Sequence, residues 1–216
     1  MNWVNKDTEI YCSFAETAGN TGCRMMNSAF YYYGLNKIYK SFSVDSIERA
    51  VNSVKTLNIK GFAITMPYKK QVLDFVDEID DTVEKIGAAN TVLNNNGILK
   101  AYNTDYLAAK KLLQKYIDKS IIGNYYLIGN GGYASAVKLA MKHCNIEPIV
   151  ITRNNWNVLK DIKDSLVYNC TPVTDLPLCE SNEFIDCIVS TSTGLELATT
   201  QAEHQFKLYT GLKFPY

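Results

Sequence analysis

The chain has 216 residues, of which 47% are hydrophobic and 20% are charged, a composition typical of an ordinary globular protein with one large domain or two small ones. Its 22 basic and 22 acidic residues give a formal net charge of zero. Composition therefore provides no electrostatic case for a nucleic-acid partner or an anionic membrane surface. The start of the chain lacks the apolar run of a secretory signal, and no run is long enough to span a bilayer. We expect a cytoplasmic protein.

Cysteine usage points away from a metal centre. Six cysteines are spread along the chain without a C-x-x-C pair, and only two histidines accompany them. Zinc sites need such ligands in clusters with characteristic spacing, so we expect no metal site. The cysteines are interpreted as buried, reduced thiols of a protein in a reducing compartment.

Strands and helices alternate in the first hundred residues. The expected strands cover residues 9–14, 38–42 and 61–66. Helical spacing of apolar residues predicts helices over 25–33, which Gly34 ends, and over 43–57, while 15–22 is expected to be a loop of small residues. Asn94–Gly97 is typical of a hairpin turn. This alternation indicates an α/β layer with a mostly parallel sheet.

The second half repeats the alternation around a glycine-rich turn. The expected strands cover 124–128, 149–151 and 185–190, and the expected helices cover 105–116 and 133–144. The order strand, glycine-rich turn, helix, strand is the context that a dinucleotide fingerprint requires. Its glycines allow a tight turn, and the helix start offers free N–H groups to a pyrophosphate. The predicted cofactor-binding residues are Gly129, Asn130, Gly131, Gly132, Tyr133 and Ala134.

The strand after this helix ends in Thr152, Arg153 and Asn154 rather than in Asp or Glu. An acidic residue there would bind the ribose 2′-hydroxyl of NAD, whereas an arginine suits the 2′-phosphate of NADP. We therefore predict NADP as the cofactor, with a solvated loop arginine as the alternative interpretation.

Three motifs carry a resemblance to a known family. ITMPYK at 64–69, IGAANTV at 86–92 and NTD at 103–105 resemble, in order and spacing, the V-T-x-P-x-K, I-G-A-x-N-T and N-T-D blocks of the shikimate/quinate dehydrogenase family. The resemblance implies a two-lobed α/β fold. Residues 1–105 with a returning helix at 199–216 would form the substrate-binding lobe, and 106–198 an abridged Rossmann-type NADP-binding lobe.

The resemblance also implies roles for single residues. Lys69 would be the catalytic acid/base, and Asp105 would orient it. A lysine in this role needs a fixed partner and a partly dry pocket, because a free lysine stays protonated at neutral pH. Thr65 and Asn90 would contact the substrate. The alternatives are an exposed Lys69, a helix N-cap at Asp105, a turn-closing Asn90 and a half-buried strand residue at Thr65.

The final helix and the segment before it extend the likeness. QAEHQFKLYTG at 201–211 resembles the family's returning helix, whose glutamine contacts the substrate and corresponds to Gln201; a plain helix-start residue is the alternative. Residues 200–203 match the capping-box pattern, which predicts that the helix begins there. Thr191 lies where the family has a segment near the nicotinamide.

Two departures from the family stand out. Asn20 and Gly22 replace the serines of a Ser-x-Ser motif that binds the substrate carboxylate, and Met26 replaces a histidine. Asn20 can still donate a hydrogen bond and Thr21 is a substitute, but we predict that shikimate binds poorly. These features resemble the divergent shikimate dehydrogenase-like subgroup.

The second departure is a missing block in the nucleotide lobe. Only five residues separate Leu195 from Gln201, where the family has on the order of 40 residues of a doubly wound sheet. A shortened sheet exposes an apolar edge unless something covers it.

The expected function is reversible hydride transfer between NADP(H) and a ring hydroxyl or ketone of shikimate, quinate or a related cyclic hydroxy acid, as in the shikimate pathway of aromatic amino acid biosynthesis. The alternative is a relative that keeps the pocket as a binding protein but has lost turnover. The partner is a small molecule, with no nucleic acid or membrane, and a homodimer is left open.

Overall fold

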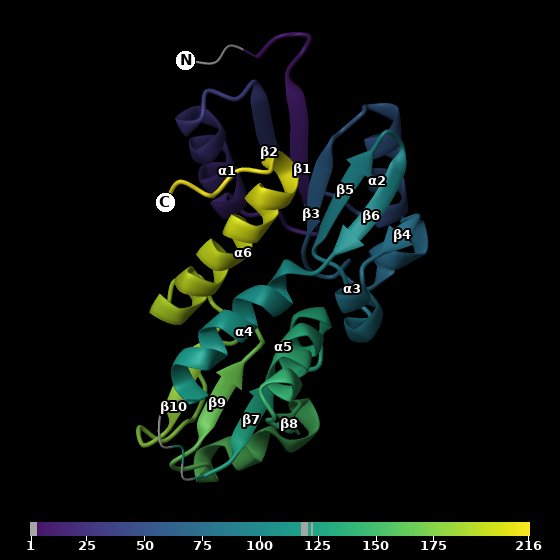
Figure 1. The fold of residues 1–216 in the computed structure, drawn as a ribbon. Coiled ribbons are helices and arrows are strands. Elements are labelled where there is room, and N and C mark those ends of the chain that lie inside the picture. The colour runs from purple at the N-terminus through teal and green to yellow at the C-terminus, as the bar shows by residue number, and fades with distance from the viewer. Residues whose placement is uncertain (1–3, 118–120, 122) are drawn as a thin grey trace. The chain divides into compact units, whose positions relative to one another are not determined.

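The structure is a computed structural model that describes residues 4–117, 121 and 123–216, and its elements are labelled in Figure 1. The chain forms two compact units, the first made of residues up to Thr104 with Ala202–Tyr216, the second of Asp105–Gln201. The chain crosses between them inside two helices, α4 (Thr104–Ile117) and α6 (Ser192–Thr210). Asp105 therefore begins the second unit, although we expected it to end the first.

The first unit contains a six-stranded sheet in the order β2-β1-β3-β5-β6-β4. Its strands are β1 (Glu9–Ala15), β2 (Lys37–Ser43), β3 (Gly61–Ile64), β4 (Glu78–Ile79), β5 (Thr91–Asn95) and β6 (Ile98–Tyr102). β1 pairs in parallel with β2 and β3, whereas β5 is antiparallel to β3 and β6. The predicted hairpin turn is confirmed, because Asn96 and Gly97 both have positive φ, at 54° and 96°, as a two-residue turn of this kind requires.

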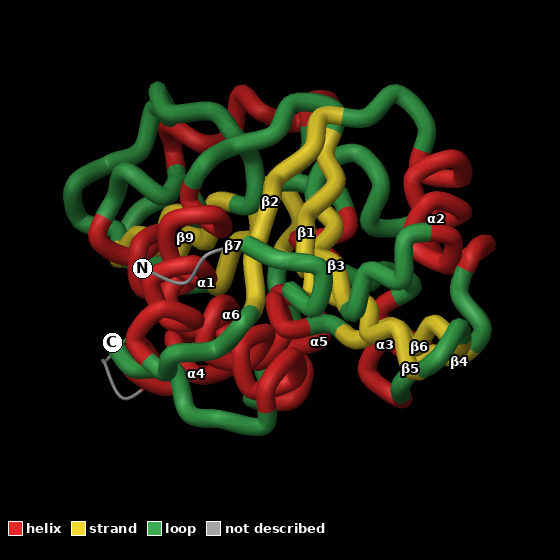
Figure 2. The backbone as a smooth tube through the Cα atoms, turned by 90° about the horizontal axis from the view of Figure 1, so that it is seen from above, coloured by secondary structure: helices red, strands yellow, loops and turns green. Residues whose placement is uncertain are grey.

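Helices cover both faces of the β1–β3 part of this sheet. The elements are α1 (Thr21–Tyr32), α2 (Ile47–Thr56), the 3₁₀ helix η1 (Gln71–Phe75) and α3 (Asp81–Ile86). Tyr11 of β1 packs against α1 and α6, and its neighbour Cys12 packs against α2, because successive strand side chains point to opposite faces. Figure 2 shows α2 on the other side of these strands from α1 and α6.

Two helix starts differ from the predictions. α1 begins at Thr21 and not at Met25, because the contact of Cys23 Sγ with Ser41 Oγ at 3.1 Å stabilises a first turn that its glycine disfavours. α2 begins at Ile47 because β2 continues to Ser43, and the Ser46 hydroxyl accepts a hydrogen bond from Arg49 N.

The second unit contains a four-stranded parallel sheet in the order β10-β9-β7-β8. Its strands are β7 (Tyr125–Ile128), β8 (Ile149–Ile151), β9 (Leu166–Asn169) and β10 (Glu183–Asp186), with α5 (Gly132–His143) and the 3₁₀ helix η2 (Arg153–Asp161) between them. The strand order reverses direction between β7 and β9, which is where doubly wound sheets bind ligands.

Two strand predictions in this unit were wrong. Strand β9 was not predicted, because its four residues are all buried and show no alternation. Strand β10 ends at Asp186 and not at Ser190, because the Asp186 carboxylate accepts a hydrogen bond from Ile188 N at 3.0 Å and turns the chain.

The edge of the shortened sheet is partly covered by its own chain. The Thr193 hydroxyl accepts a hydrogen bond from Asp186 N and donates one to Asp186 O, both at 2.9 Å. These bonds occupy the backbone groups with which another strand would pair at this residue. Phe184, earlier on the strand, is 36% exposed.

The final helix is longer than predicted. α6 is a single helix of 19 residues from Ser192, so the predicted capping box at Thr200 lies inside the helix and is wrong. The N-cap is Thr191, whose hydroxyl accepts a hydrogen bond from Gly194 N at 3.1 Å. The apolar face of this helix is buried, since Ala202, Phe206 and Tyr209 all lie in the core of the first unit.

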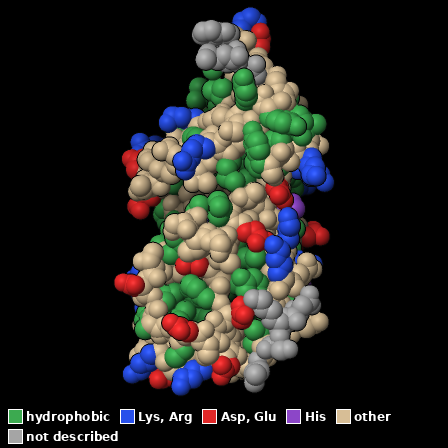
Figure 3. Space-filling view, turned by 90° about the vertical axis from the view of Figure 1, so that its left-hand side faces the viewer, with side chains coloured by type: hydrophobic (Ala, Val, Ile, Leu, Met, Phe, Trp, Pro, Cys, Tyr) green, Lys and Arg blue, Asp and Glu red, His purple; other side chains and the backbone are tan. Residues whose placement is uncertain are grey.

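The C-terminal segment is tied to α1. The Tyr216 hydroxyl donates to Ser28 O at 3.2 Å, and the Tyr33 hydroxyl donates to Lys213 O at 2.7 Å. Tyr32 and Tyr216 remain 63% and 65% exposed, and Figure 3 shows hydrophobic side chains at the surface of this unit. These contacts hold the last turn of α6 on the first unit. Within the described ranges, no helix has the length and hydropathy needed to cross a bilayer.

Candidate functional site

The glycine-rich turn of the second unit follows β7. Gly129 has φ of +110°, and its N–H donates to Ile151 O at 2.8 Å. A Cβ at this position would lie 3.0 Å from Thr171 Cγ2. Both conformation and space therefore require glycine here, and the hydrogen bond brings the turn beside the end of β8.

At Gly131, neither a positive φ nor a lack of space requires glycine. It is the N-cap of α5 with an extended backbone, and its Cβ would meet no heavy atom within 4 Å. Packing among the described residues therefore does not require glycine at this position. The first turn of α5 contains no acidic residue, so its N–H groups suit a phosphate. The residues present fit a dinucleotide.

The predicted 2′-phosphate residues follow β8. Thr152 caps η2 together with Asn155, whose Oδ1 accepts a hydrogen bond from Thr152 N at 2.7 Å. Arg153 begins η2 and is exposed. Arg153 and Asn154 thus lie in the first turn of a 3₁₀ helix, and the hydrogen bond between Gly129 and Ile151 brings this turn to the same edge of the sheet as the glycine-rich turn.

A tyrosine pair lies behind this turn. The hydroxyl of Tyr133, in the first turn of α5, is 2.9 Å from that of Tyr168 on β9. Burial raises the pKa of both phenols, and the charges of Cys170 and Asp105 raise it further.

The predicted catalytic residue Asp105 is buried, at 2% exposed. It is the second residue of α4, so the alternative interpretation of Asp105 as an N-cap is wrong.

In the first unit, backbone hydrogen bonds bring three predicted site residues together. Ile64 N donates to Asn90 O, and Ala89 N donates to Lys69 O, both at 2.8 Å. These bonds join the segment that carries Thr65 and Lys69 to the segment that carries Asn90. Thr65 is exposed, and Lys69 is half-buried.

Asn90 holds the junction between β5 and α4. Its Oδ1 accepts from Thr104 N at 2.8 Å and from the Thr91 hydroxyl at 3.0 Å, and its Nδ2 donates to Thr104 Oγ1 at 2.9 Å. Asn90 is 0% exposed, and these bonds occupy its amide group. Its contribution here is to fix the frame around Lys69, and the direct contact with substrate stays a prediction.

Gln205 of α6 is a residue that sequence reasoning missed. It is buried, and its Nε2 donates to Thr91 Oγ1 at 3.0 Å, so α6 is linked to the Asn90 network. The sequence feature that could have identified Gln205 is its position one helical turn after Gln201. Gln201, which was predicted to contact substrate, is half-buried within α6 and is the last residue of the second unit.

The residues that replace the Ser-x-Ser motif lie at the start of α1. Asn20 is the exposed N-cap, and its side chain makes no capping hydrogen bond. A Cβ at Gly22 would lie 3.2 Å from the Tyr39 ring, so there is little room for a side chain. Cys23, which was interpreted only as a buried thiol, is half-buried and contacts Ser41, whose hydroxyl is 3.0 Å from that of Ser13.

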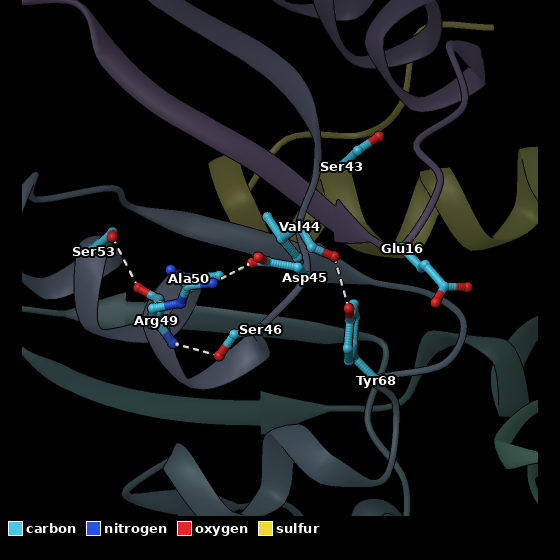
Figure 4. A pocket seen from close by; sticks show the side chains of 9 residues that line it. All are labelled: Glu16, Ser43, Val44, Asp45, Ser46, Arg49, Ala50, Ser53 and Tyr68. Atoms are coloured by element: carbon cyan, nitrogen blue, oxygen red, sulfur yellow. Dashed lines mark hydrogen bonds and ion pairs between the residues drawn. The ribbon is translucent and has the colours of Figure 1, made fainter.

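A separate hollow of about 710 Å³ opens beside α2, and Figure 4 shows the side chains around it. Tyr68 forms one wall, and its hydroxyl donates to Val44 O at 2.7 Å. The Arg49–Asp45 ion pair at 2.7 Å lines it too, but both side chains are more than 70% exposed, so the pair contributes little. None of the predicted site residues lines this hollow.

The second unit's parallel sheet, with a glycine-rich turn at its switch point, defines an abridged Rossmann-type unit, here joined to a second α/β unit. Residues 21–92 match the family model described as the shikimate dehydrogenase substrate binding domain. A solved shikimate 5-dehydrogenase-like protein is 30% identical, with 98% of this chain and 94% of that one covered and a TM-score of 0.80. The chain belongs to the shikimate dehydrogenase family, as the three motifs predicted.

Two curated relatives support this assignment. The shikimate dehydrogenase-like protein of Haemophilus influenzae is 39% identical over 153 residues, 70% of this chain and 56% of that protein. A shikimate dehydrogenase (NADP(+)) of Methanosphaera stadtmanae is 33% identical over 177 residues, 81% of this chain and 57% of that protein. The chain thus spans a little over half the length of these relatives.

Proposed function

We propose that this protein is an NADP-dependent oxidoreductase. It transfers a hydride reversibly between NADP(H) and a ring hydroxyl or ketone of a cyclic hydroxy acid such as shikimate or quinate. The observation that carries the proposal is the glycine-rich turn at the switch point of the parallel sheet, which leads into a helix whose first turn contains no acidic residue. The printed name of the Methanosphaera relative, shikimate dehydrogenase (NADP(+)), supports NADP as the cofactor.

The cofactor would be held at the carboxyl edge of the second sheet. The Gly129–Ala134 turn would bind the pyrophosphate through backbone N–H groups, and Arg153 with its neighbours Thr152 and Asn154 would bind the 2′-phosphate. Thr191 would lie near the nicotinamide. NADP would supply the hydride acceptor, and side chains of the protein would move the proton and orient the substrate.

Lys69 would take the proton of the substrate hydroxyl, and Asp105 would accept a hydrogen bond from that hydroxyl and orient the lysine. These roles rest on the motif match at both positions. Thr65, Gln201 and Asn20 would orient the ring, and orientation supplies much of the rate in such a site.

The test of cofactor binding separates it from folding. In a Trp3→Phe background, energy transfer from Trp156 to NADPH reports binding. We expect saturable binding in the wild type and binding weaker by about tenfold or more in Gly131→Val. The urea midpoint is measured beside it to establish that this variant is folded, because valine is a poor N-cap residue. Gly19→Val is the matched control, since a Cβ at Gly19 also meets open space but lies in the first unit. Equal binding by Gly131→Val would remove the proposed pyrophosphate site.

A panel of cyclic hydroxy acids then tests turnover through the absorbance of the NADPH formed. The abridged sheet motivates a second candidate, a binding protein without turnover. NADP binding without product from any member of the panel would favour that candidate, and product formation would exclude it.

A further inference from the structure

We propose that Cys170 and Cys187 form a redox-sensitive dithiol that small-molecule disulfides oxidise to an intramolecular disulfide, and that this oxidation weakens nucleotide binding. The two cysteines follow the ends of β9 and β10. The claim about the nucleotide rests on the proposed function, whereas the claim about the disulfide does not.

The register of the strands places the two cysteines opposite each other. Leu166 is opposite Glu183, and Asn169 is opposite Asp186. At the start of the ladder, Glu183 N donates a hydrogen bond of 2.9 Å to the carbonyl oxygen of Ser165. Ser165 is the residue before Leu166, the partner of Glu183.

The same pattern recurs one residue beyond the strands. Cys187 N donates to Asn169 O at 3.2 Å, which continues the register and makes Cys170 the partner of Cys187. Neighbouring strands lie about 4.8 Å apart, and disulfides join residues whose Cα atoms are about 4.4–6.8 Å apart. The backbone spacing therefore suits a disulfide.

The side chains share a face of the sheet. Cys170 is two residues after Tyr168, so strand alternation puts them on one face, and Cys187 follows Ile185, the partner of Tyr168, in the same way. The Cys187 Sγ donates to Thr171 O at 3.6 Å, next to Cys170. The pKa of Tyr168, raised mainly by burial, is raised further by both cysteines.

Neither cysteine is fully buried. Cys170 and Cys187 are half-buried, which corrects the expectation that all the cysteines are buried. Cys12 does fit that expectation: it is 0% exposed, and burial raises the pKa of its thiol, so it stays inert. In a reducing compartment, a disulfide that forms between strand ends is transient and suited to sensing.

The reaction is two successive thiol–disulfide exchanges. One cysteine thiolate attacks a sulfur of a disulfide such as oxidised glutathione, forming a mixed disulfide and releasing one thiolate. The second cysteine thiolate then attacks the protein sulfur of the mixed disulfide and expels the other. The protein loses two electrons and two thiol protons, and the small disulfide is reduced to two thiols.

The disulfide would form directly beside the glycine-rich turn. A Cβ at Gly129 would lie 3.4 Å from Cys170 O and 3.0 Å from Thr171 Cγ2. Asn169 fixes this segment, since its Oδ1 accepts hydrogen bonds from Thr171 N at 2.9 Å and Thr171 Oγ1 at 2.7 Å. A disulfide also needs Cβ atoms about 3.5–4.5 Å apart, which is closer than the spacing of about 4.8 Å between strands. Its formation therefore draws Cys170 toward Cys187 and shifts a segment that packs on the turn, so NADP should bind more weakly.

The test incubates the wild type with oxidised glutathione and maps disulfides by mass spectrometry without reduction. We expect a loss of about two mass units and a peptide that joins Cys170 to Cys187. Cys144→Ser, which changes another half-buried thiol of the same unit, should give the same product. Cys170→Ser and Cys187→Ser should give at most a glutathione adduct. Absence of the Cys170–Cys187 peptide from the oxidised wild type would overturn the proposal.

The second part of the test titrates the protein with NADPH before oxidation, after oxidation, and after reduction with dithiothreitol. We expect affinity to fall by about tenfold or more on oxidation and to return on reduction, with no change in the doubly substituted Cys170→Ser, Cys187→Ser protein. An unchanged affinity in the disulfide form would refute the coupling. A reduced wild type that does not bind NADPH would refute the proposed function instead, while the peptide map would still decide whether the disulfide forms.

Discussion

The substitution Asn90→Ala should destabilise the first unit far more than an ordinary asparagine replacement. It removes four hydrogen bonds, three with Thr104 and one with Thr91, at a residue that is 0% exposed; three of the four are within 3.0 Å. A typical bond of this kind contributes about 0.5–1.5 kcal/mol. The three shorter bonds together predict a loss of about 3 kcal/mol, and the buried Thr104 N–H left without its acceptor adds to it.

The assay is urea unfolding at equilibrium, followed by far-ultraviolet circular dichroism. The midpoint should fall while the slope of the transition stays the same, because the surface exposed on unfolding does not change. Asn52→Ala is the control: Asn52 is exposed on α2, and its replacement should change the free energy of unfolding by less than about 0.5 kcal/mol. A loss below about 1 kcal/mol in Asn90→Ala would contradict its role in the frame.

Three further predictions concern the cofactor, acid stability and the substrate. Arg153→Ala should weaken NADP by about 1–3 kcal/mol in a calorimetric titration and leave NAD nearly unchanged; equal losses would exclude a contact with the 2′-phosphate. Hydrogen bonds from Leu99 N and Lys55 lower the pKa of Asp77, so its stabilising effect is present at neutral pH and is lost as the pH falls through the lowered folded-state pKa. The urea midpoint of the wild type should therefore exceed that of Asp77→Asn by less at about pH 3 than at about pH 7, and a constant difference would argue against it. Shikimate should have a high Michaelis constant, because Asn20 and Gly22 replace two hydroxyl donors worth about 1.5–3 kcal/mol each; a micromolar value would mean that another group binds the carboxylate.

Much of the fold was predictable because its signals are local. The hairpin at Asn94–Gly97 and the glycine-rich turn before α5 require particular backbone angles, and those angles leave a mark in the sequence. The missed strand β9 is buried on both faces, so it has no alternation to detect. The early start of α1 at Thr21 depends on tertiary contacts that override the low helix propensity of its first turn.

The candidate site was predictable to a smaller degree. Motifs identified the segments that carry Lys69 and Asn90, but the buried network that encloses the Asn90 amide depends on partners distant in the chain. The expected apolar edge of the shortened sheet was a reasonable inference from length alone. Its partial cover by Thr193 depends on a tight turn that only the structure reveals.

The central claim is hydride transfer that depends on Lys69 and Asp105. The most direct test is the steady-state rate of NADPH formation on the best substrate of the panel, in the wild type, Lys69→Ala, Asp105→Asn and the double variant. Each single replacement should lower turnover by about 10²–10⁴-fold, and the double variant should be little worse than the slower single one, because residues that serve one step are non-additive. NADP affinity should stay the same in all four proteins. Undiminished turnover in Lys69→Ala would contradict the account.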